Sequence, residues 1–121
     1  MYSYHADSEH YCILVLPGID SRTAGLKQAV LNLNTGKYAA ANLDLLFDLY
    51  NIDQGVMVIK KFANAAESKN YMADLLASDA FHGYSPGEVK VFVIAAANYK
   101  KMLNDKNAAP YFSFYSANYT P

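Results

Sequence analysis

The chain has 121 residues, of which 53% are hydrophobic and 17% are charged, a balance typical of one globular domain rather than of a disordered segment. The formal net charge of −1, with ten scattered basic residues, excludes the basic patch of a nucleic-acid-binding protein. No apolar run approaches the roughly 20 residues that a membrane-spanning helix needs, and the single cysteine excludes an intramolecular disulfide.

The chain begins with a polar lead, which is followed by a strand. Residues 1–10 are polar and uncharged at the front, which does not fit a signal peptide, so we expect either a cytoplasmic protein or a domain of a longer exported chain. Tyr11–Leu16 is apolar at every position and predicts a strand that Pro17-Gly18 ends. Cys12 lies within this strand and is interpreted as a buried thiol. Residues 11–121 are expected to form a single domain.

Two helices are predicted from their caps and their apolar faces. Asp20 and Ser21 both suit the N-cap of the first helix, and Gly36 stands where its C-cap is expected. Its apolar face consists of Leu26, Ala29, Val30 and Leu33. The second helix follows Asn64, which suits an N-cap with Glu67 at N3. Its buried face is expected to be Tyr71, Met72, Leu75 and Leu76.

Three further strands differ in polarity. Leu43–Tyr50 alternates with period two and carries Asp44 and Asp48, whereas Val56–Ile59, the start of the strand Val56–Phe62, is wholly apolar. The link 51–55 is turn-rich and of hairpin length, so these two strands are expected to be antiparallel. After a loop over 78–87, the segment 88–95 predicts the fourth strand and carries Glu88 and Lys90. Strands that are apolar on both faces belong at the centre of a sheet, while edge strands tolerate charge.

The element order is therefore β-α-β-β-α-β, which is the ferredoxin-like arrangement of the α+β class. Right-handed crossovers place both main helices on one face of an antiparallel sheet and give the strand order 4-1-3-2. In this order the first and third strands are central, in agreement with their polarity.

A helical extension follows the fourth strand. Asn98 is expected to cap a short helix that reaches Leu103, and Asn107 a last helix with Pro110 in its first turn. This tail is rich in aromatic residues: Tyr111, Phe112, Phe114, Tyr115 and Tyr119. Because the two main helices cover only one face of the sheet, the second apolar face needs another cover. We expect the aromatic tail to provide it, with a partner surface as the alternative.

The candidate residues for chemistry do not form a catalytic or metal-binding constellation. His5 and His10 flank Asp7 and Glu9, which allows a weak surface metal site, but solvated polar residues of the lead are the simpler interpretation. Cys12 within a central strand is a poor nucleophile, and Asp44 with Asp48 fits the solvated face of an edge strand. A small enzyme with a cavity between sheet and helices would need a polar residue directed into that cavity, and only the loop pair His82 and Tyr84 comes close to this. We predict no catalytic, cofactor-binding or metal-ligating residue.

The placement of aromatic and aliphatic residues from Tyr2 to Tyr119 also resembles a known family, the C-terminal domain of the tetratricopeptide-repeat lipoproteins that serve gliding motility and type IX secretion in Bacteroidetes. The segments that carry the resemblance are Glu9-His10-Tyr11, the helix Leu26–Asn34 with Tyr38 and Leu43, the run Val56–Phe62 with Asn64, Ala66 and Tyr71-Met72, Phe92-Val93-Ile94 with Asn98-Tyr99, and Tyr111-Phe112, Phe114 and Asn118-Tyr119.

The resemblance implies a periplasmic domain of an outer-membrane-associated lipoprotein, located after helical repeats and without enzyme activity. We therefore expect a non-catalytic interaction domain that contacts other envelope proteins or its own parent chain, with no cofactor, no nucleic acid and no direct membrane insertion. A homodimer through a sheet face is a further expectation. The alternatives are a peptidoglycan-binding module of similar strand–helix order and a small ferredoxin-like enzyme with a cavity between sheet and helices.

Overall fold

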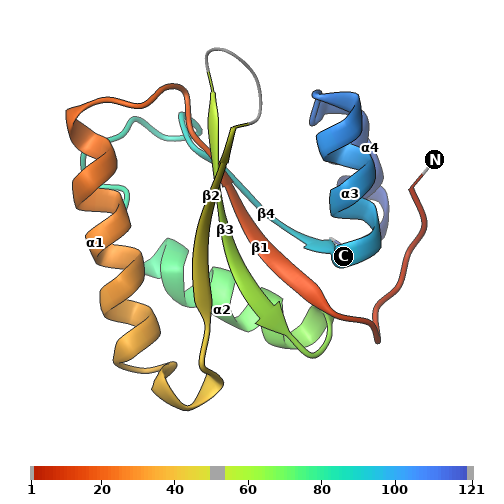
Figure 1. Cartoon of the computed structure of the whole chain (residues 1–121), viewed down its shortest axis with the longest axis horizontal. Coiled ribbons are helices and arrows are strands. Elements are labelled where there is room, and N and C mark those ends of the chain that lie inside the picture. Colours follow the sequence, from red (N-terminus) through yellow and green to blue (C-terminus); the bar gives the residue numbers. More distant parts are fainter. Residues whose placement is uncertain (1, 50–53, 120–121) are drawn as a thin grey trace.

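The computed structural model describes residues 2–49 and 54–119, and Figure 1 shows its four strands and the helices around them. A short 3-10 helix, Ala39–Ala41, precedes the second strand. The elements in chain order are β1 (His10–Val15), α1 (Ser21–Thr35), β2 (Asp44–Leu49), β3 (Gly55–Phe62), α2 (Ala65–Ala77), β4 (Lys90–Ala95), α3 (Ala96–Asp105) and α4 (Ala109–Asn118).

The four strands form one antiparallel sheet in the order β2-β3-β1-β4. This confirms the predicted ferredoxin-like α+β fold with strand order 4-1-3-2. The polarity argument holds because no residue of Cys12–Leu16 or Val56–Ile59 is more than 3% exposed. The predicted link between β2 and β3 lies largely outside the described residues.

The strand register assigns each side chain to a face. Ile13 lies opposite Val58 on β3 and Phe92 on β4, and Phe92 contacts the ring of Tyr111 in α4 at 5.3 Å. Since successive side chains of a strand alternate between faces, Cys12 points to the other face. On that face the ring of Phe62 contacts the ring of Tyr71 in α2 at 5.2 Å. The sheet is therefore covered on both sides.

The predicted caps of the two main helices are present. The side chain of Asp20 accepts the backbone N–H of Arg22, the N–H of Asp20 donates to Thr23 in a reciprocal capping box, and Gly36 is the C-cap of α1. At the start of α2, the Asn64 side chain accepts the N–H of Glu67 at 2.9 Å. One expectation for α2 is wrong: Leu76 is 52% exposed, because it lies one position beyond the buried stripe that Tyr71 and Leu75 define.

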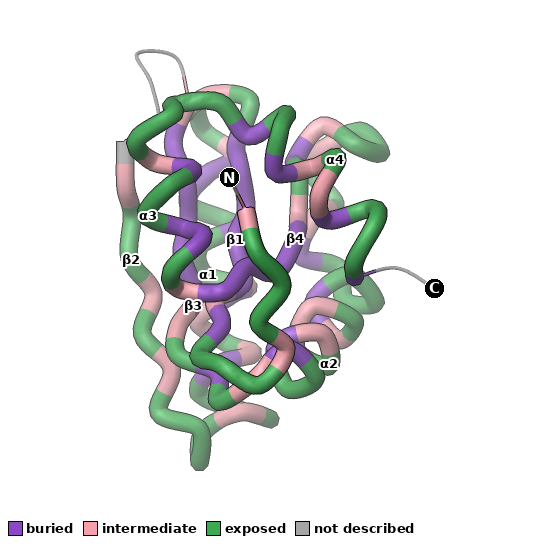
Figure 2. Tube along the Cα trace, turned by 90° about the vertical axis from the view of Figure 1, so that its right-hand side faces the viewer, coloured by how far each residue is buried: buried purple, intermediate pink, exposed green. Residues whose placement is uncertain are grey.

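The second sheet face is covered by α3 and the N-terminal lead as well as by the aromatic tail. Tyr99 and Met102 of α3 are buried, and so are Tyr111 and Tyr115 of α4. The lead passes between α3 and α4 (Figure 2), and the ring of Tyr2 lies 5.1 Å from that of Tyr111 in α4. The tail thus packs back on the domain as expected, but as one part of a larger cover.

The predicted caps of α3 and α4 need correction. Ala95 is the N-cap of α3, and Asn98 lies inside its first turn, fully buried. The side chain of Asn98 instead holds the lead, since it donates to the Ser3 carbonyl at 2.6 Å and accepts the Ser3 N–H at 3.2 Å. The N-cap of α4 is Ala108, one residue after Asn107, although the Asn107 side chain does accept the N–H of Ala109 at 3.1 Å.

Candidate functional site

The histidines and acidic residues of the lead do not gather into a metal site. His5, Asp7 and Glu9 are exposed, and Glu9 accepts the Tyr11 hydroxyl at 3.0 Å. Across residues 2–49 and 54–119, no three His, Cys, Asp or Glu side chains are placed to hold a metal ion.

His10 is not the solvated residue that the sequence predicts, because it is fully buried at the start of β1. Its Nδ1 lies 2.8 Å from the Ser8 carbonyl, and its Nε2 lies 2.8 Å from the Tyr119 hydroxyl. A carbonyl only accepts, so Nδ1 carries the proton and Nε2 accepts from Tyr119. Burial lowers the pKa of His10, which favours this neutral form. The histidine therefore joins the lead to the end of α4.

Cys12 is fully buried, and burial raises the pKa of its thiol to about 12. A thiol with so high a pKa supplies almost no thiolate near neutral pH, and the thiolate is the nucleophilic form. The structure therefore agrees with the interpretation of Cys12 as a small buried hydrophobe.

The two aspartates of β2 have different surroundings. Asp44 is exposed, whereas Asp48 accepts the hydroxyl of the buried Tyr99 at 2.6 Å. Burial, followed by the hydrogen bond to Asp48, raises the pKa of Tyr99. The expectation that Asp48 is only a solvated edge residue is therefore wrong: it connects β2 to α3 across the second face of the sheet.

His82 and Tyr84, the loop pair considered for a cavity, line a groove of about 380 Å³ beside α1. His82 is exposed, while the Tyr84 ring lies under the Arg22 guanidinium at 4.3 Å. Arg22 is itself paired with Asp20 at 2.7 Å and with Glu88 at 2.9 Å. Hydrogen bonds from the Arg22 side chain and from its backbone N–H lower the pKa of Asp20 to about 2. Tyr84 therefore belongs to a cluster that fixes the 78–89 loop against α1, whereas His82 stays exposed beside it.

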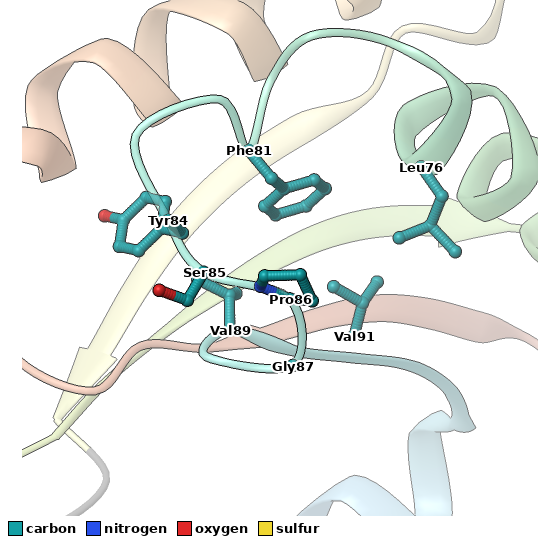
Figure 3. Close-up of a pocket in the computed structure, with 8 residues that line it drawn as sticks. All are labelled: Leu76, Phe81, Tyr84, Ser85, Pro86, Gly87, Val89 and Val91. Atoms are coloured by element: carbon teal, nitrogen blue, oxygen red, sulfur yellow. The ribbon is translucent and has the colours of Figure 1, made fainter.

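An apolar groove of about 300 Å³ lies between the C-terminal end of α2, the 78–89 loop and β4, as Figure 3 shows. Its lining residues are Leu76, Phe81, Tyr84, Ser85, Pro86, Gly87, Val89 and Val91. A second hollow of about 390 Å³ shares Leu76, Gly87, Val89 and Val91 and extends to Lys90 and Phe112. We call the two hollows together the β4 groove.

The β4 groove runs along an open edge of the sheet, and two backbone hydrogen bonds fix which residues face that edge. Leu16 N–H donates to the Gly55 carbonyl and Ala96 N–H to the Glu9 carbonyl, both at 3.0 Å. Bonded and non-bonded pairs alternate along antiparallel ladders, and Leu14 is opposite Val91. Val91 therefore directs its backbone N–H and C=O away from β1, toward the free edge.

The open part of this edge ends at Val93. The Tyr111 hydroxyl of α4 donates to the Val93 carbonyl at 2.7 Å and so occupies the next outward-facing acceptor. Among the residues that the structure describes, no side chain makes a comparable hydrogen bond to the outward-facing N–H or C=O of Val91. The β4 groove thus combines a short free strand edge with apolar side-chain pockets.

The sequence signals for this site were present but indirect. The charges of Glu88 and Lys90 indicated an edge strand, but its free length depends on where α4 packs. The exposure of Leu76 was missed because a helical stripe of apolar residues was extended by one position.

Comparisons of the chain with protein-family models, with curated proteins and with solved structures each give no match. In the described part of the chain, no helix has the length and apolar character needed to cross a membrane.

Proposed function

We propose that this chain is a non-catalytic interaction domain and that it binds a protein partner through the β4 groove. The observation that carries the proposal is the coincidence of an apolar groove with unpaired backbone groups on the same edge strand. Leu76 is 52% exposed beside Val91, whose N–H and C=O face outward. Exposed apolar surface joined to a free strand edge is a recurrent way of binding extended peptides.

The candidate catalytic groups support this proposal because their side chains are held in structural contacts outside the β4 edge or are buried in the core. His10 and Asp48 hold the cover of the sheet in place, Cys12 is a buried thiol, and Tyr84 packs under Arg22. Each therefore has a structural contact that explains its position. The alternative of peptidoglycan binding needs an exposed polar sheet face, whereas helices lie over both faces of this sheet.

The cellular setting of the proposal rests on the family resemblance. We propose that the domain works in the periplasm as part of an outer-membrane-associated lipoprotein for secretion or gliding, where its partners are other envelope proteins or its parent chain. Since both sheet faces are covered, partner binding through the β4 edge replaces the expected dimer through a sheet face in this proposal.

Selection from a displayed library of random linear peptides tests the proposal. We expect the purified domain to enrich linear peptides, and the variant Leu76→Lys to lose them, because a charge at this position blocks the apolar groove. The matched control is Leu46→Lys, since Leu46 is 43% exposed on the opposite edge strand, β2. Absence of enrichment, or equal enrichment by Leu76→Lys, would contradict the proposal.

A further inference from the structure

We infer that the β4 groove binds an extended partner segment that adds a strand to the sheet and alternates apolar with acidic side chains. This inference rests on the proposed function and specifies its ligand. It follows from three features of the groove: the direction of the free backbone groups, the apolar pocket on one side of β4, and the positive charge on the other.

The backbone of β4 offers hydrogen bonds to an added strand over a short length. Val91 directs its N–H and C=O outward, and by the same alternation the edge continues toward Val89, just before β4. At Val93 the added strand must stop, because the Tyr111 hydroxyl already holds the carbonyl. The docked part of the partner is therefore a short extended segment.

On the side of β4 that faces α2, an added strand meets the apolar pocket of the β4 groove. Val91 points to this side with Leu76 and Phe81, as Figure 3 shows. Alternate side chains of an added strand point to the same face as Val91. Those side chains must be apolar to remove the exposed pocket surface from water.

On the opposite side of β4, an added strand meets positive charge. Lys90 alternates with Val91, and its Nζ lies 5.3 Å from the centre of the Phe112 ring. Lys90 also lines a hollow of about 150 Å³ together with Lys106. Within residues 2–49 and 54–119, no carboxylate forms an ion pair with Lys90, and the nearby Glu88 is paired with Arg22. The remaining side chains of the segment therefore match best when they are acidic.

The other edge of the sheet has the opposite character. β2 carries Asp44 and Asp48, which repel an acidic segment and oppose the pairing of two copies through their β2 edges. An acidic strand is thus directed to β4 rather than to β2.

The probe for this inference is a blocked synthetic peptide of alternating valine and glutamate, with alternating valine and lysine as its charge control. Fluorescence anisotropy measures the affinity of the full domain for each peptide. We expect the glutamate peptide to bind about tenfold more tightly, and Lys90→Glu to remove this preference. Lys100→Glu, a change of the same type at an exposed position of α3, is expected to leave the preference intact.

Backbone methylation of the probe tests strand addition itself. The valine amides all point to one side of an extended peptide and the glutamate amides to the other, so methylating one set must abolish binding and methylating the other must not. Amide hydrogen exchange of Val91 is expected to slow when the probe binds. If both methylated peptides bind like the parent, or Val91 exchange is unchanged, the inference is overturned.

The two proposals fail in distinguishable ways. Library peptides that depend on Leu76 but lack the apolar–acidic alternation would leave the interaction function standing and overturn the inference. A library without any Leu76-dependent binder would overturn both.

Discussion

Tyr111 provides a direct test of the packing of α4, because its side chain is fully buried and makes contacts from three directions. Its ring lies 5.1 Å from that of Tyr2 and 5.3 Å from that of Phe92, and its hydroxyl donates to the Val93 carbonyl. A buried aromatic side chain removes about 150–250 Å² from water, worth about 4–6 kcal/mol at about 25 cal/mol per Å². Measured truncations of buried aromatic residues cost about 3–5 kcal/mol. We therefore expect Tyr111→Ala to lower the free energy of unfolding by about 4 kcal/mol.

Urea unfolding followed by far-ultraviolet circular dichroism measures this change. With a slope of about 2 kcal/mol per molar urea, the expected loss shifts the unfolding midpoint by about 2 M. Tyr4→Ala is the matched control, because Tyr4 is 49% exposed on the lead and its loss is expected to cost less than about 1 kcal/mol. Tyr111→Phe isolates the hydroxyl and is expected to cost about 1–2 kcal/mol. A Tyr111→Ala curve that overlays the parent curve would refute the packing of α4 on the sheet.

Three further changes test other parts of the structure. Ile13→Ala, in the fully buried centre of the sheet, is expected to cost about 2–5 kcal/mol in the same urea assay, and a neutral result would refute its central position. Asp48→Ala is expected to cost about 1.5 kcal/mol because the Tyr99 hydroxyl loses its charged acceptor, whereas Asp44→Ala should be near neutral; equal effects would refute the bond. Burial lowers the pKa of His10 from 6.5, so below about pH 6.5 the unfolded chain binds more protons at this residue than the folded chain does. The contribution of His10 to the free energy of unfolding is therefore complete above pH 6.5 and is lost as the pH falls toward the lowered pKa. Unfolding measured across this range should show less pH dependence for His10→Gln than for the parent chain.

The sheet could be predicted from the sequence because its signal is local and repeated. Val56–Ile59 and Cys12–Leu16 are apolar at consecutive positions, which only a doubly covered strand tolerates. The charges at Asp44 and Lys90 then assign the two edges. Each of these statements depends on a few neighbouring residues, so no knowledge of distant contacts was required.

The positions of the polar residues could not be predicted in the same way, because their partners are distant in sequence. His10 is polar and ends a polar lead, but it is buried, and its Nε2 accepts the hydroxyl of Tyr119, 109 positions away. Asp48 appears solvated in the alternation of β2 until Tyr99 is placed above it. Asn98 is a suitable helix cap by type, yet its side chain holds Ser3, 95 positions away. Residue type indicated hydrogen bonding correctly, while the partner depended on how α3 and α4 pack.

The C-terminal extension links the stability of the domain to the shape of its proposed binding site. Both faces of the central strands are apolar, so α3 and α4 are needed to cover the face that α1 and α2 leave open. The same packing brings Tyr111 to the Val93 carbonyl and Phe112 to the side of Lys90. The first contact ends the free part of β4, and the second places an aromatic ring beside the groove. A ferredoxin-like sheet without this extension would expose a longer edge and a bare apolar face, both of which favour non-specific association. The extension therefore covers the second face and leaves only a short free edge on β4, which favours the selective binding of a single extended segment that we propose.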